Sequence, residues 1–364
     1  MATTLYCPRC PQVALQHVEL HGQELDHCPN CDGIWFEDEE LSDAIRHKHG
    51  LHDDYCVRQG FAEPLKQHQY HCHRCDVPMQ QFHLLKEYLV TVDSCPQCSG
   101  TWVDGGDVRQ VLAAPKLQQA LSVLNQKVCR KSWLFQFFTQ MPKEYNIKPH
   151  RTPWVTWSLL ALNCLIYLLY GFDDASTEWV FNHFAFISTD ILQGQGLWGF
   201  ISYQFLHGSL WHLFGNMYFL WIIGDNLEDA LGCRRFLGLY LLCGIAAALV
   251  ELAARALIGQ ELLMVGASGA VAGLFGMYLL WFRHASLTFM FIVWQKKLSP
   301  TWYFALWVAM NVFGLLLDDI GVAYWAHLGG FAAGLLIGYC YRQRVLQNNP
   351  LLCLLQRPEA RIIR

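Results

Sequence analysis

The stretch VGASGAVAGLFG, residues 265–276, places one serine among glycines and alanines in a segment that is otherwise apolar. A polar side chain inside a membrane span is costly, and by default it marks a pathway or an active site. Small residues such as glycine let a membrane helix approach its neighbours closely. The stretch therefore predicts a helix of a membrane bundle in which Ser268 has a chemical role.

The composition divides the chain into two unlike halves. Of its 364 residues, 53% are hydrophobic and 15% are charged, against about 25% charged in an average soluble domain. The half before about residue 150 is polar and rich in His and Cys, and the rest is apolar. The net charge of -4 provides no basic surplus for binding nucleic acid. We expect two domains, one of them in a membrane.

Six apolar runs are long enough to cross about 30 Å of hydrocarbon. A further apolar segment, HASLTFMFIVWQKK from residue 284, is too short for a seventh crossing, and we interpret it as an extension of the fourth span or an interfacial piece. The predicted spans are residues 153–171, 200–224, 234–257, 267–283, 301–317 and 324–341.

Basic residues predict the orientation of these spans. They cluster before the first span, between the second and third, between the fourth and fifth, and after the sixth, and such clusters stay in the cytoplasm. The opening residues also lack the charged start and apolar run of a secretory signal, so we expect both termini to be cytoplasmic. The clusters are Lys143, Lys148 and Arg151; Arg234 and Arg235; Arg283, Lys296 and Lys297; Arg342 and Arg344.

Polar residues mark the second, fourth and sixth spans, which all run from the outer face inward. His212, Ser268 and His327 therefore lie near the outer ends of their helices and can meet at one depth. A serine hydroxyl is a weak nucleophile until a base takes its proton, and His327 is the histidine of the last three spans that can do so. His212 and Asn216, four residues apart on one helix face, can donate hydrogen bonds to an oxyanion together with the Ser268 N–H.

Glycines accompany both predicted catalytic residues. Gly266, Gly269 and Gly273 surround Ser268, and Gly330 and Gly334 form a G-x-x-x-G just after His327, so each helix can approach its neighbours closely. A lone G-x-S-G is often a packing device, and a lone intramembrane histidine often makes only a structural hydrogen bond. The joint occurrence of all these elements at matching ends of three alternate spans favours an active site.

The motifs H-x-x-x-N, G-x-S-G and A-H-x-G-G in these three spans resemble those of rhomboid intramembrane serine proteases, over about residues 150–345. GDNLEDALG, residues 224–232, resembles the polar turn that rhomboids place after the second span. Two positions depart from the pattern. Ala272 stands where many rhomboids have an aromatic residue that stacks on the histidine, and the first outer loop offers Trp179 in place of a Trp-Arg pair.

The resemblance implies a role for each residue. Ser268 is the nucleophile, and His327 is the general base and acid without an acidic third partner. His212 and Asn216 form the oxyanion site, and His207 is structural. No catalytic cofactor is implied.

Eight cysteines in the first half form two quartets. Each quartet consists of two C-x-x-C pairs. The pairs are separated by 17 residues in the first quartet and by 19 in the second, which is the spacing of zinc ribbons. Two such pairs close a tetrahedral four-sulfur site with no open position, so we predict two structural zinc ions. The alternatives are free or redox-active thiols, or ligation by His27, His71 or His73. The quartets are Cys7, Cys10, Cys28 and Cys31, and Cys72, Cys75, Cys95 and Cys98.

The quartets belong to an internal duplication. CPNCDGIWFEDEEL from residue 28 and CPQCSGTWVDGGDV from residue 95 align Gly33 with Gly100 and Trp35 with Trp102. Short hairpins are expected between the cysteine pairs, and a short helix is expected at EDEELSDAIRHKHG. Each module resembles the transcription-factor-type zinc ribbons.

We therefore expect an α-helical polytopic membrane protein, a six-span rhomboid-like bundle, with a small β-rich zinc-ribbon domain at its N-terminus. The predicted segments are tandem ribbons over 1–112 (modules about 5–45 and 70–112), an amphipathic helix and linker over 113–150, the six-span domain over 151–345 and a cytoplasmic tail over 346–364.

The expected activity is that of a serine endopeptidase of the bacterial inner membrane, which cuts single-span membrane proteins within the lipid bilayer near its extracytoplasmic face. Helix-weakening or small residues at the cleavage site are expected. Because Lys and Arg are sparse in the ribbons, a cytosolic protein partner is favoured over nucleic acid. The alternatives are a non-catalytic rhomboid-like binder of membrane proteins and a membrane-tethered nucleic-acid module.

Overall fold

The computed structural model divides the chain into two compact units, residues 1–123 with 350–363, and residues 124–349. The expected amphipathic helix within 113–150 and most of the tail lie outside the residues that the structure describes. These are residues 5–20, 23–52, 55–61, 64–85, 88–115, 117, 133, 136, 142–145, 149, 151–283, 285–291, 294–317, 321–349 and 352–353.

The first unit is built on one antiparallel sheet of seven strands in the order β1-β2-β3-β7-β6-β5-β4. The expected hairpins are present as β1 with β2 and β5 with β6. The strands are β1 (Gln16–Leu20), β2 (Gln23–His27), β3 (Ile34–Phe36), β4 (Pro64–His71), β5 (Pro78–Leu85), β6 (Tyr88–Ser94) and β7 (Thr101–Val103).

Among the residues described in this unit, three short helices accompany the sheet: α1 (Glu40–His49), the 3-10 turn η1 (Val57–Gly60) and α2 (Val108–Val111). The helix expected at EDEELSDAIRHKHG is α1. Its first turn is acidic and its last turn basic, which complements the helix dipole. It ends at Gly50, which adopts the left-handed conformation at φ 60°.

The two modules meet where β3 pairs with β7, with Trp35 opposite Trp102. Each indole lies against the glycine of the other module: a Cβ on Gly33 would lie 2.2 Å from Trp102 Cζ2, and one on Gly100 would lie 2.1 Å from Trp35 Cζ2. Both indoles are fully buried. The repeated Gly-x-Trp thus joins the duplicated modules: the tryptophan of each module packs on the glycine of the other, because only glycine leaves room for the ring.

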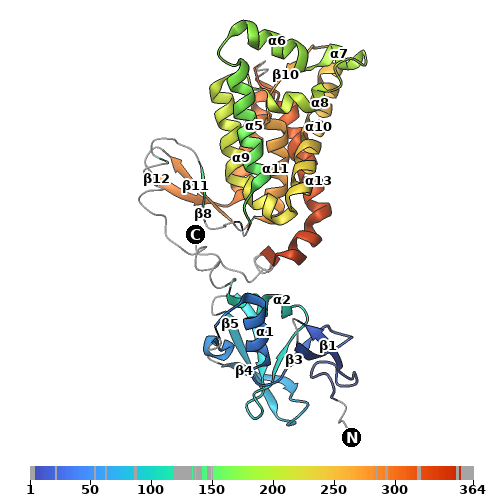
Figure 1. The fold of residues 1–364 in the computed structure, drawn as a ribbon, viewed down its shortest axis with the longest axis vertical. Coiled ribbons are helices and arrows are strands. Elements are labelled where there is room, and N and C mark those ends of the chain that lie inside the picture. The colour runs from blue at the N-terminus through green and yellow to red at the C-terminus, as the bar shows by residue number, and fades with distance from the viewer. Residues whose placement is uncertain are drawn as a thin grey trace. The chain divides into compact units, whose positions relative to one another are not determined.

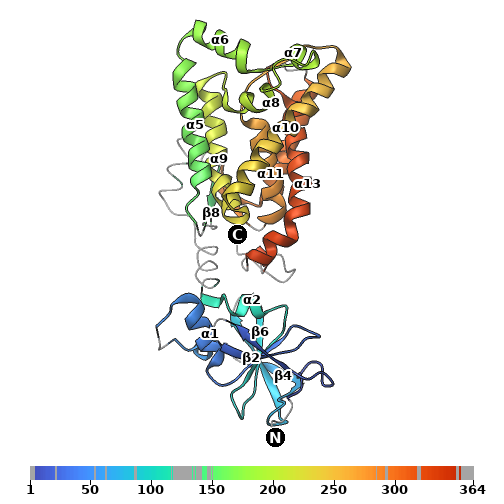
Figure 2. The same ribbon diagram turned by 45° about the vertical axis from the view of Figure 1, so that its right-hand side comes forward.

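Over its described residues, the second unit is a helical bundle whose six main helices overlap the six predicted apolar runs (Figures 1 and 2). Within the described part of the chain, α10 alone is long and apolar enough to pass as a membrane crossing, and α5, α11 and α12 are apolar but shorter. The helices are α5 (Trp154–Tyr170), α9 (Leu210–Leu231), α10 (Cys233–Ile258), α11 (Ser268–Trp281), α12 (Pro300–Leu316) and α13 (Tyr324–Asn348).

Short elements connect α5 to α9. They are α6 (Asp174–Phe184), β9 (Phe186–Ile187), α7 (Ser188–Leu192), α8 (Gly199–Ser202) and the 3-10 turn η2 (Tyr203–Phe205), and β10 (Leu263–Met264) pairs with β9.

The prediction that the second span begins near residue 200 is wrong, because α9 begins at Leu210. Ser209 caps this helix, since its side-chain oxygen accepts the backbone N–H of His212 at 3.1 Å. His207 consequently lies before the helix and not inside it.

The segment from residue 284 does not extend the fourth helix. It forms a hairpin of β11 (Ser286–Phe291) and β12 (Trp294–Leu298), in keeping with its content of aromatic and β-branched residues. Strand β8 (Lys143–Tyr145) pairs with β11 and completes a three-stranded sheet beside the bundle (Figure 1). The linker before the first span therefore contributes a strand that sequence analysis missed.

Helix α11 lies inside the bundle, against α9, α10, α12 and α13. Its contact with α13 is so close that a Cβ on Gly330 would lie 2.1 Å from the Gly269 carbonyl oxygen, and one on Gly334 would lie 1.9 Å from that of Gly273. These glycines bring the backbones of the two helices together. The serine and the histidine predicted to react stand at the ends of these two helices.

Candidate active site and metal centres

Ser268 is the first residue of α11, and the loop before it is shaped by Gly266. Gly266 has φ 129°, a conformation that residues with side chains rarely adopt. A Cβ there would also lie 2.7 Å from Cε1 of His212, and the Gly266 N–H donates to the Tyr203 carbonyl at 2.9 Å. Glycine at this position therefore lets the His212 imidazole lie directly against the loop that carries the serine.

His327 stands in the first turn of α13, and its Nε2 lies 2.9 Å from the Ser268 Oγ. The two residues come from helices far apart in the sequence. The close contact of α11 with α13 at Gly269 and Gly330 brings them together. At this distance the hydroxyl donates a hydrogen bond to an unprotonated Nε2, which is the arrangement needed to activate a serine nucleophile.

A buried carboxylate of α10 holds the start of α13. Glu251 is fully buried, and its Oε2 accepts the backbone N–H of Ala326, one residue before the histidine, at 2.7 Å. Its Oε1 accepts the Nε–H of Arg255 at 2.9 Å. This pair was not predicted, although an acid and a base four residues apart in an apolar run of the sequence are a signal for it.

The His327 ring has a second hydrogen-bond partner on α12. Its Nδ1 lies 2.7 Å from Oδ1 of Asn311, which is buried. The ring also packs against Trp307, at 5.9 Å between centroids, and against the edge of Tyr324, at 6.4 Å. These neighbours orient the imidazole where Ala272 provides no ring. Asn311 was not predicted as a site residue, although a single amide in an apolar helix is a signal for a functional role.

The two residues predicted to bind an oxyanion are both on α9. Gly208 N–H points to His212 Nδ1 at 3.4 Å, so in the neutral ring Nε2 carries the hydrogen and faces the loop at Gly266. Asn216 donates one Nδ2–H to the His212 carbonyl at 3.0 Å and has a second N–H for another acceptor. The structure thus places His212 against the serine loop and Asn216 one turn further along α9.

His207 is fully buried beside these residues, with its ring 5.1 Å from that of His212. Its backbone N–H and carbonyl both meet the Tyr170 hydroxyl, at 2.6 and 2.9 Å, and neither ring nitrogen has a partner among the described residues. The Tyr170 contacts fix the turn that leads into α9.

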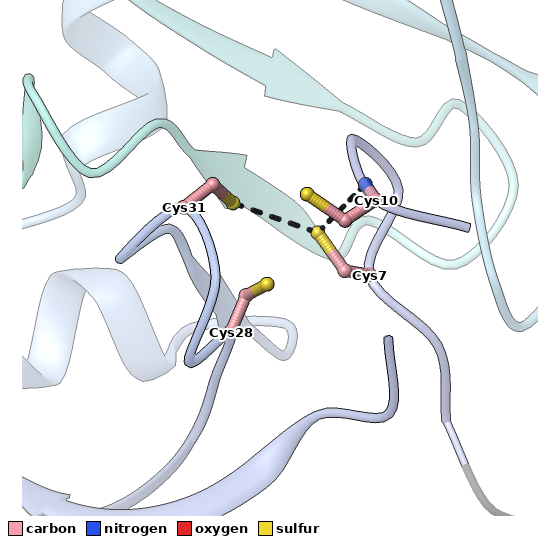
Figure 3. A group of neighbouring side chains, drawn as sticks. All are labelled: Cys7, Cys10, Cys28 and Cys31. Carbon is pink, nitrogen blue, oxygen red and sulfur yellow. Dashed lines mark hydrogen bonds between the residues drawn. The ribbon is translucent and has the colours of Figure 1, made fainter. Parts of the chain in front are cut away.

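The two cysteine quartets of the first unit are assembled as ligand sets. In each quartet the four Sγ atoms lie within 4.8 Å of one another, and Figure 3 shows the first set turned toward a common point. The Sγ atoms of Cys7 and Cys31 lie 3.7 Å apart, and those of Cys72 and Cys98 lie 3.6 Å apart. A tetrahedral zinc with Zn–S bonds of about 2.3 Å separates its sulfurs by about 3.8 Å. The donor sets therefore fit zinc.

The surroundings support metal ligation by thiolates. Burial raises the pKa of the Cys7 and Cys72 thiols, so a nearby cation is needed to keep them ionised. The backbone N–H of Cys10 donates to Cys7 Sγ at 3.1 Å (Figure 3).

Two of the three neighbouring histidines have other contacts. His73 packs on Trp35 at 4.2 Å, where burial lowers its pKa to about 4, and His27 lies 3.2 Å from Asp32. Among the described residues, each ligand group consists of four cysteines.

Comparisons with known proteins agree with this division. Residues 194–344 match the rhomboid domain, and residues 6–47 and 71–114 match the transcription factor zinc-finger. Rhomboid protein 1, mitochondrial, of Saccharomyces cerevisiae is 34% identical over 144 residues, which are 38% of this chain and 40% of that protein. RHOMBOID-like protein 4 of Arabidopsis thaliana is 34% identical over 150 residues, which are 41% and 35% of the two chains.

A third relative is the Presenilin-associated rhomboid-like protein, mitochondrial, of Bos taurus. It is 28% identical over 131 residues, 36% of this chain and 34% of that protein. The chain thus spans less than half the length of these curated relatives. The match to the rhomboid domain, residues 194–344, includes Ser268 and His327.

Proposed function

We propose that this chain, which carries a rhomboid domain joined to two zinc-ribbon segments, is an intramembrane serine protease that cleaves membrane-spanning segments of other proteins. The observation that carries the proposal is the 2.9 Å contact between Ser268 Oγ and His327 Nε2, made by two helices of the rhomboid domain. A packing serine does not require an imidazole at this distance, whereas a nucleophile does.

The reaction follows from this geometry. His327 Nε2 takes the hydroxyl proton while Ser268 Oγ attacks the scissile carbonyl carbon. The carbonyl oxygen becomes an oxyanion, which accepts hydrogen bonds from the Ser268 N–H and from the side chains of His212 and Asn216. The Ser268 N–H is free of an intrahelical acceptor because it begins α11. His327 then gives its proton to the leaving amine, and a water activated by the same base hydrolyses the acyl-enzyme.

The six main helices form the membrane domain in this proposal, with both termini in the cytosol and the reacting residues toward the extracytoplasmic side, in the inner membrane of a bacterium. Large apolar side chains are exposed along α5 and α12, where lipid contacts them, including Leu165, Leu169, Leu306 and Met310. Hydrolysis requires that water reach Ser268 from the outer face. A substrate helix must also unwind there, so cleavable spans carry glycine, proline or small residues.

The zinc ribbons serve to dock a cytosolic protein in this proposal. Their four-sulfur sites leave no coordination position for a substrate, so the metal supports the fold. Nucleic acid that binds the full chain with an affinity falling steeply with salt would contradict this assignment.

The test is cleavage of a single-span reporter protein in proteoliposomes, together with labelling by a fluorophosphonate probe. We expect Ser268→Ala and His327→Ala each to lower the cleavage rate at least about 1,000-fold, and Ser268→Ala to abolish labelling. Ser158→Ala is the matched control, because Ser158 is an exposed helical serine of α5 whose Oγ donates to the Trp154 carbonyl. Unchanged cleavage by Ser268→Ala would contradict the proposal. Absent labelling of the wild type would favour a non-catalytic binder.

A further inference from the structure

The position of Asn311 points to a residue that acts on the nucleophile through the histidine. We infer that Asn311 is a positioning residue which holds His327 in the tautomer that can accept the Ser268 proton. The inference rests on the proposed protease function and adds a third member, from α12, to the serine and histidine. The acceptor at His327 Nδ1 is thus a neutral amide and not a carboxylate.

The orientation of the Asn311 amide follows from its other hydrogen bond. Its Nδ2 lies 2.7 Å from the backbone carbonyl oxygen of Trp307, one helical turn earlier on α12. A carbonyl oxygen only accepts hydrogen bonds, so the NH2 end of the amide must face it. The Oδ1 end therefore faces His327, and the two ends of the side chain cannot be exchanged without losing this bond.

The tautomer of His327 follows from that orientation. An amide oxygen has no hydrogen to give, so at 2.7 Å the ring Nδ1 must be the donor. A neutral imidazole carries one N–H, which leaves Nε2 with a free lone pair 2.9 Å from the Ser268 hydroxyl. The opposite tautomer would set the lone pair of Nδ1 against the Asn311 Oδ1, which loses that hydrogen bond, and its hydrogen on Nε2 would leave this nitrogen unable to take the serine proton.

The same contact serves the next step of the reaction. When His327 holds the serine proton, Nδ1 still donates to Asn311 Oδ1, and the bond becomes charge-assisted. Helix α12 also supplies Trp307, which packs on the imidazole from the preceding turn of the same helix side. One side of α12 therefore fixes both the rotation and the protonation of the ring.

Asn163 on α5 provides a matched control for this inference. It is fully buried, and its Nδ2 donates to the carbonyl of Leu159, four residues earlier, at 2.8 Å. Its Oδ1 has no hydrogen-bond partner within the described residues. Asn163 thus reproduces the burial and the backbone bond of Asn311, and it differs in having no contact with the histidine.

The experiment uses the full chain in proteoliposomes and compares Asn311→Ala, Asn311→Asp and Asn163→Ala. Three quantities are measured: the rate of covalent labelling of Ser268 by the fluorophosphonate, kcat and KM for the reporter protein, and the apparent unfolding midpoint. We expect Asn311→Ala to lower kcat and the labelling rate about 10- to 100-fold with little change in KM, as loss of an outer partner of a functional histidine does elsewhere. Asn311→Asp restores an acceptor of the same shape and is expected to recover about tenfold of that loss.

The control separates positioning from stability. Asn163→Ala is expected to label and cleave at the wild-type rate even if its midpoint falls as far as that of Asn311→Ala. If Asn311→Ala does not fold, Asn311→Leu, which fills the space without an acceptor, replaces it. Wild-type labelling rates in Asn311→Ala or Asn311→Leu, or equal losses in the Asp and Ala variants, would overturn the inference and leave the protease intact. A wild type that neither labels nor cleaves would overturn the proposed function itself.

Discussion

Both units of the chain use glycine to let two segments touch, and the consequences differ. In the first unit, Gly33 and Gly100 make room for two indoles, and the contact joins two copies of one module. In the second unit, Gly330 and Gly334 make room for the backbone of α11. There the contact brings a hydroxyl to an imidazole. The same packing device thus builds a closed structural core in one unit and an apposition of reactive groups in the other.

The units also differ in what holds their irregular segments. The first unit gathers its loops at two sites of four sulfurs each, which would fill the coordination sphere of a zinc ion. The second unit holds helix starts with buried carboxylates: Glu251 accepts the N–H of Ala326, and Glu228 accepts those of Val155 and Thr156 at 2.9 and 2.8 Å. Loss of metal should therefore damage one unit and spare the other.

Removal of metal is the strongest test of this difference. We expect two zinc ions per chain, and we expect a strong chelator to unfold the first unit, since structural zinc contributes about 10–16 kcal/mol to the folding of such domains. The measurements are metal content, loss of strand signal in circular dichroism and new proteolytic cleavage within residues 5–115. The helical unit should keep its unfolding midpoint, and equal damage to both units would refute the comparison.

A larger residue at the contact of α11 with α13 should act on the reaction instead. In Gly330→Val, the new Cβ would lie 2.1 Å from the Gly269 carbonyl oxygen, which is too close for two unbonded atoms. The helices α11 and α13 must therefore move apart. A displacement of about 1 Å at reacting groups lowers the rate about 100-fold.

Cleavage rate and probe labelling measure this effect. The control is Gly238→Ala on α10, where a Cβ would meet no atom within 4 Å. This variant should be as active as the wild type and slightly more stable, because alanine favours the helix by up to about 1 kcal/mol. Full activity of Gly330→Val would show that the close contact is not needed.

Motifs with short spacing were predictable from the sequence, and contacts between distant segments were not. Cys7 and Cys10, or Ser268 with its glycines, carry their chemistry in neighbouring residues, so spacing alone reveals them. Glu251 and Asn311 have their partners on another helix, and only the packing of the bundle shows which amide or carboxylate faces His327. A polar residue in an apolar run signals a role without naming its partner.

Strand β8 shows the same limit at the level of the fold. Its partner β11 lies more than a hundred residues further on, and a three-residue strand has too little pattern to be recognised. The predicted start of the second span, near residue 200, is wrong for a local reason, since α9 begins at Leu210. The apolar run begins near residue 200, but the cap at Ser209 decides where the helix begins, and hydrophobicity alone does not report a cap.

The smallest expected effect concerns Glu144 on β8, which ties the linker to the helical unit. Its Oε2 accepts the Nδ2–H of buried Asn226 at 2.8 Å, and its Oε1 accepts the hydroxyl of buried Tyr278. Burial of the carboxyl group, and then the nearby charge of Asp225, raise the pKa of Glu144 well above its usual value. The folded state therefore binds this proton more tightly than the unfolded state does.

The sign of the pH dependence follows from that difference. The stability contributed by the protonated carboxyl is fully present below the unfolded pKa of about 4.3 and is lost as the pH rises through the folded value. The unfolding midpoint of Glu144→Gln should thus lie about 2–4 °C above that of the wild type at pH 8, the shift that a gain of about 1 kcal/mol in the free energy of unfolding produces in a unit of this size. The two midpoints should converge toward pH 4. Glu178→Gln on the exposed face of α6 controls for removal of one carboxylate. A Glu144→Gln midpoint below that of the wild type at pH 8 would show instead that Glu144 is held ionised between α9 and α11.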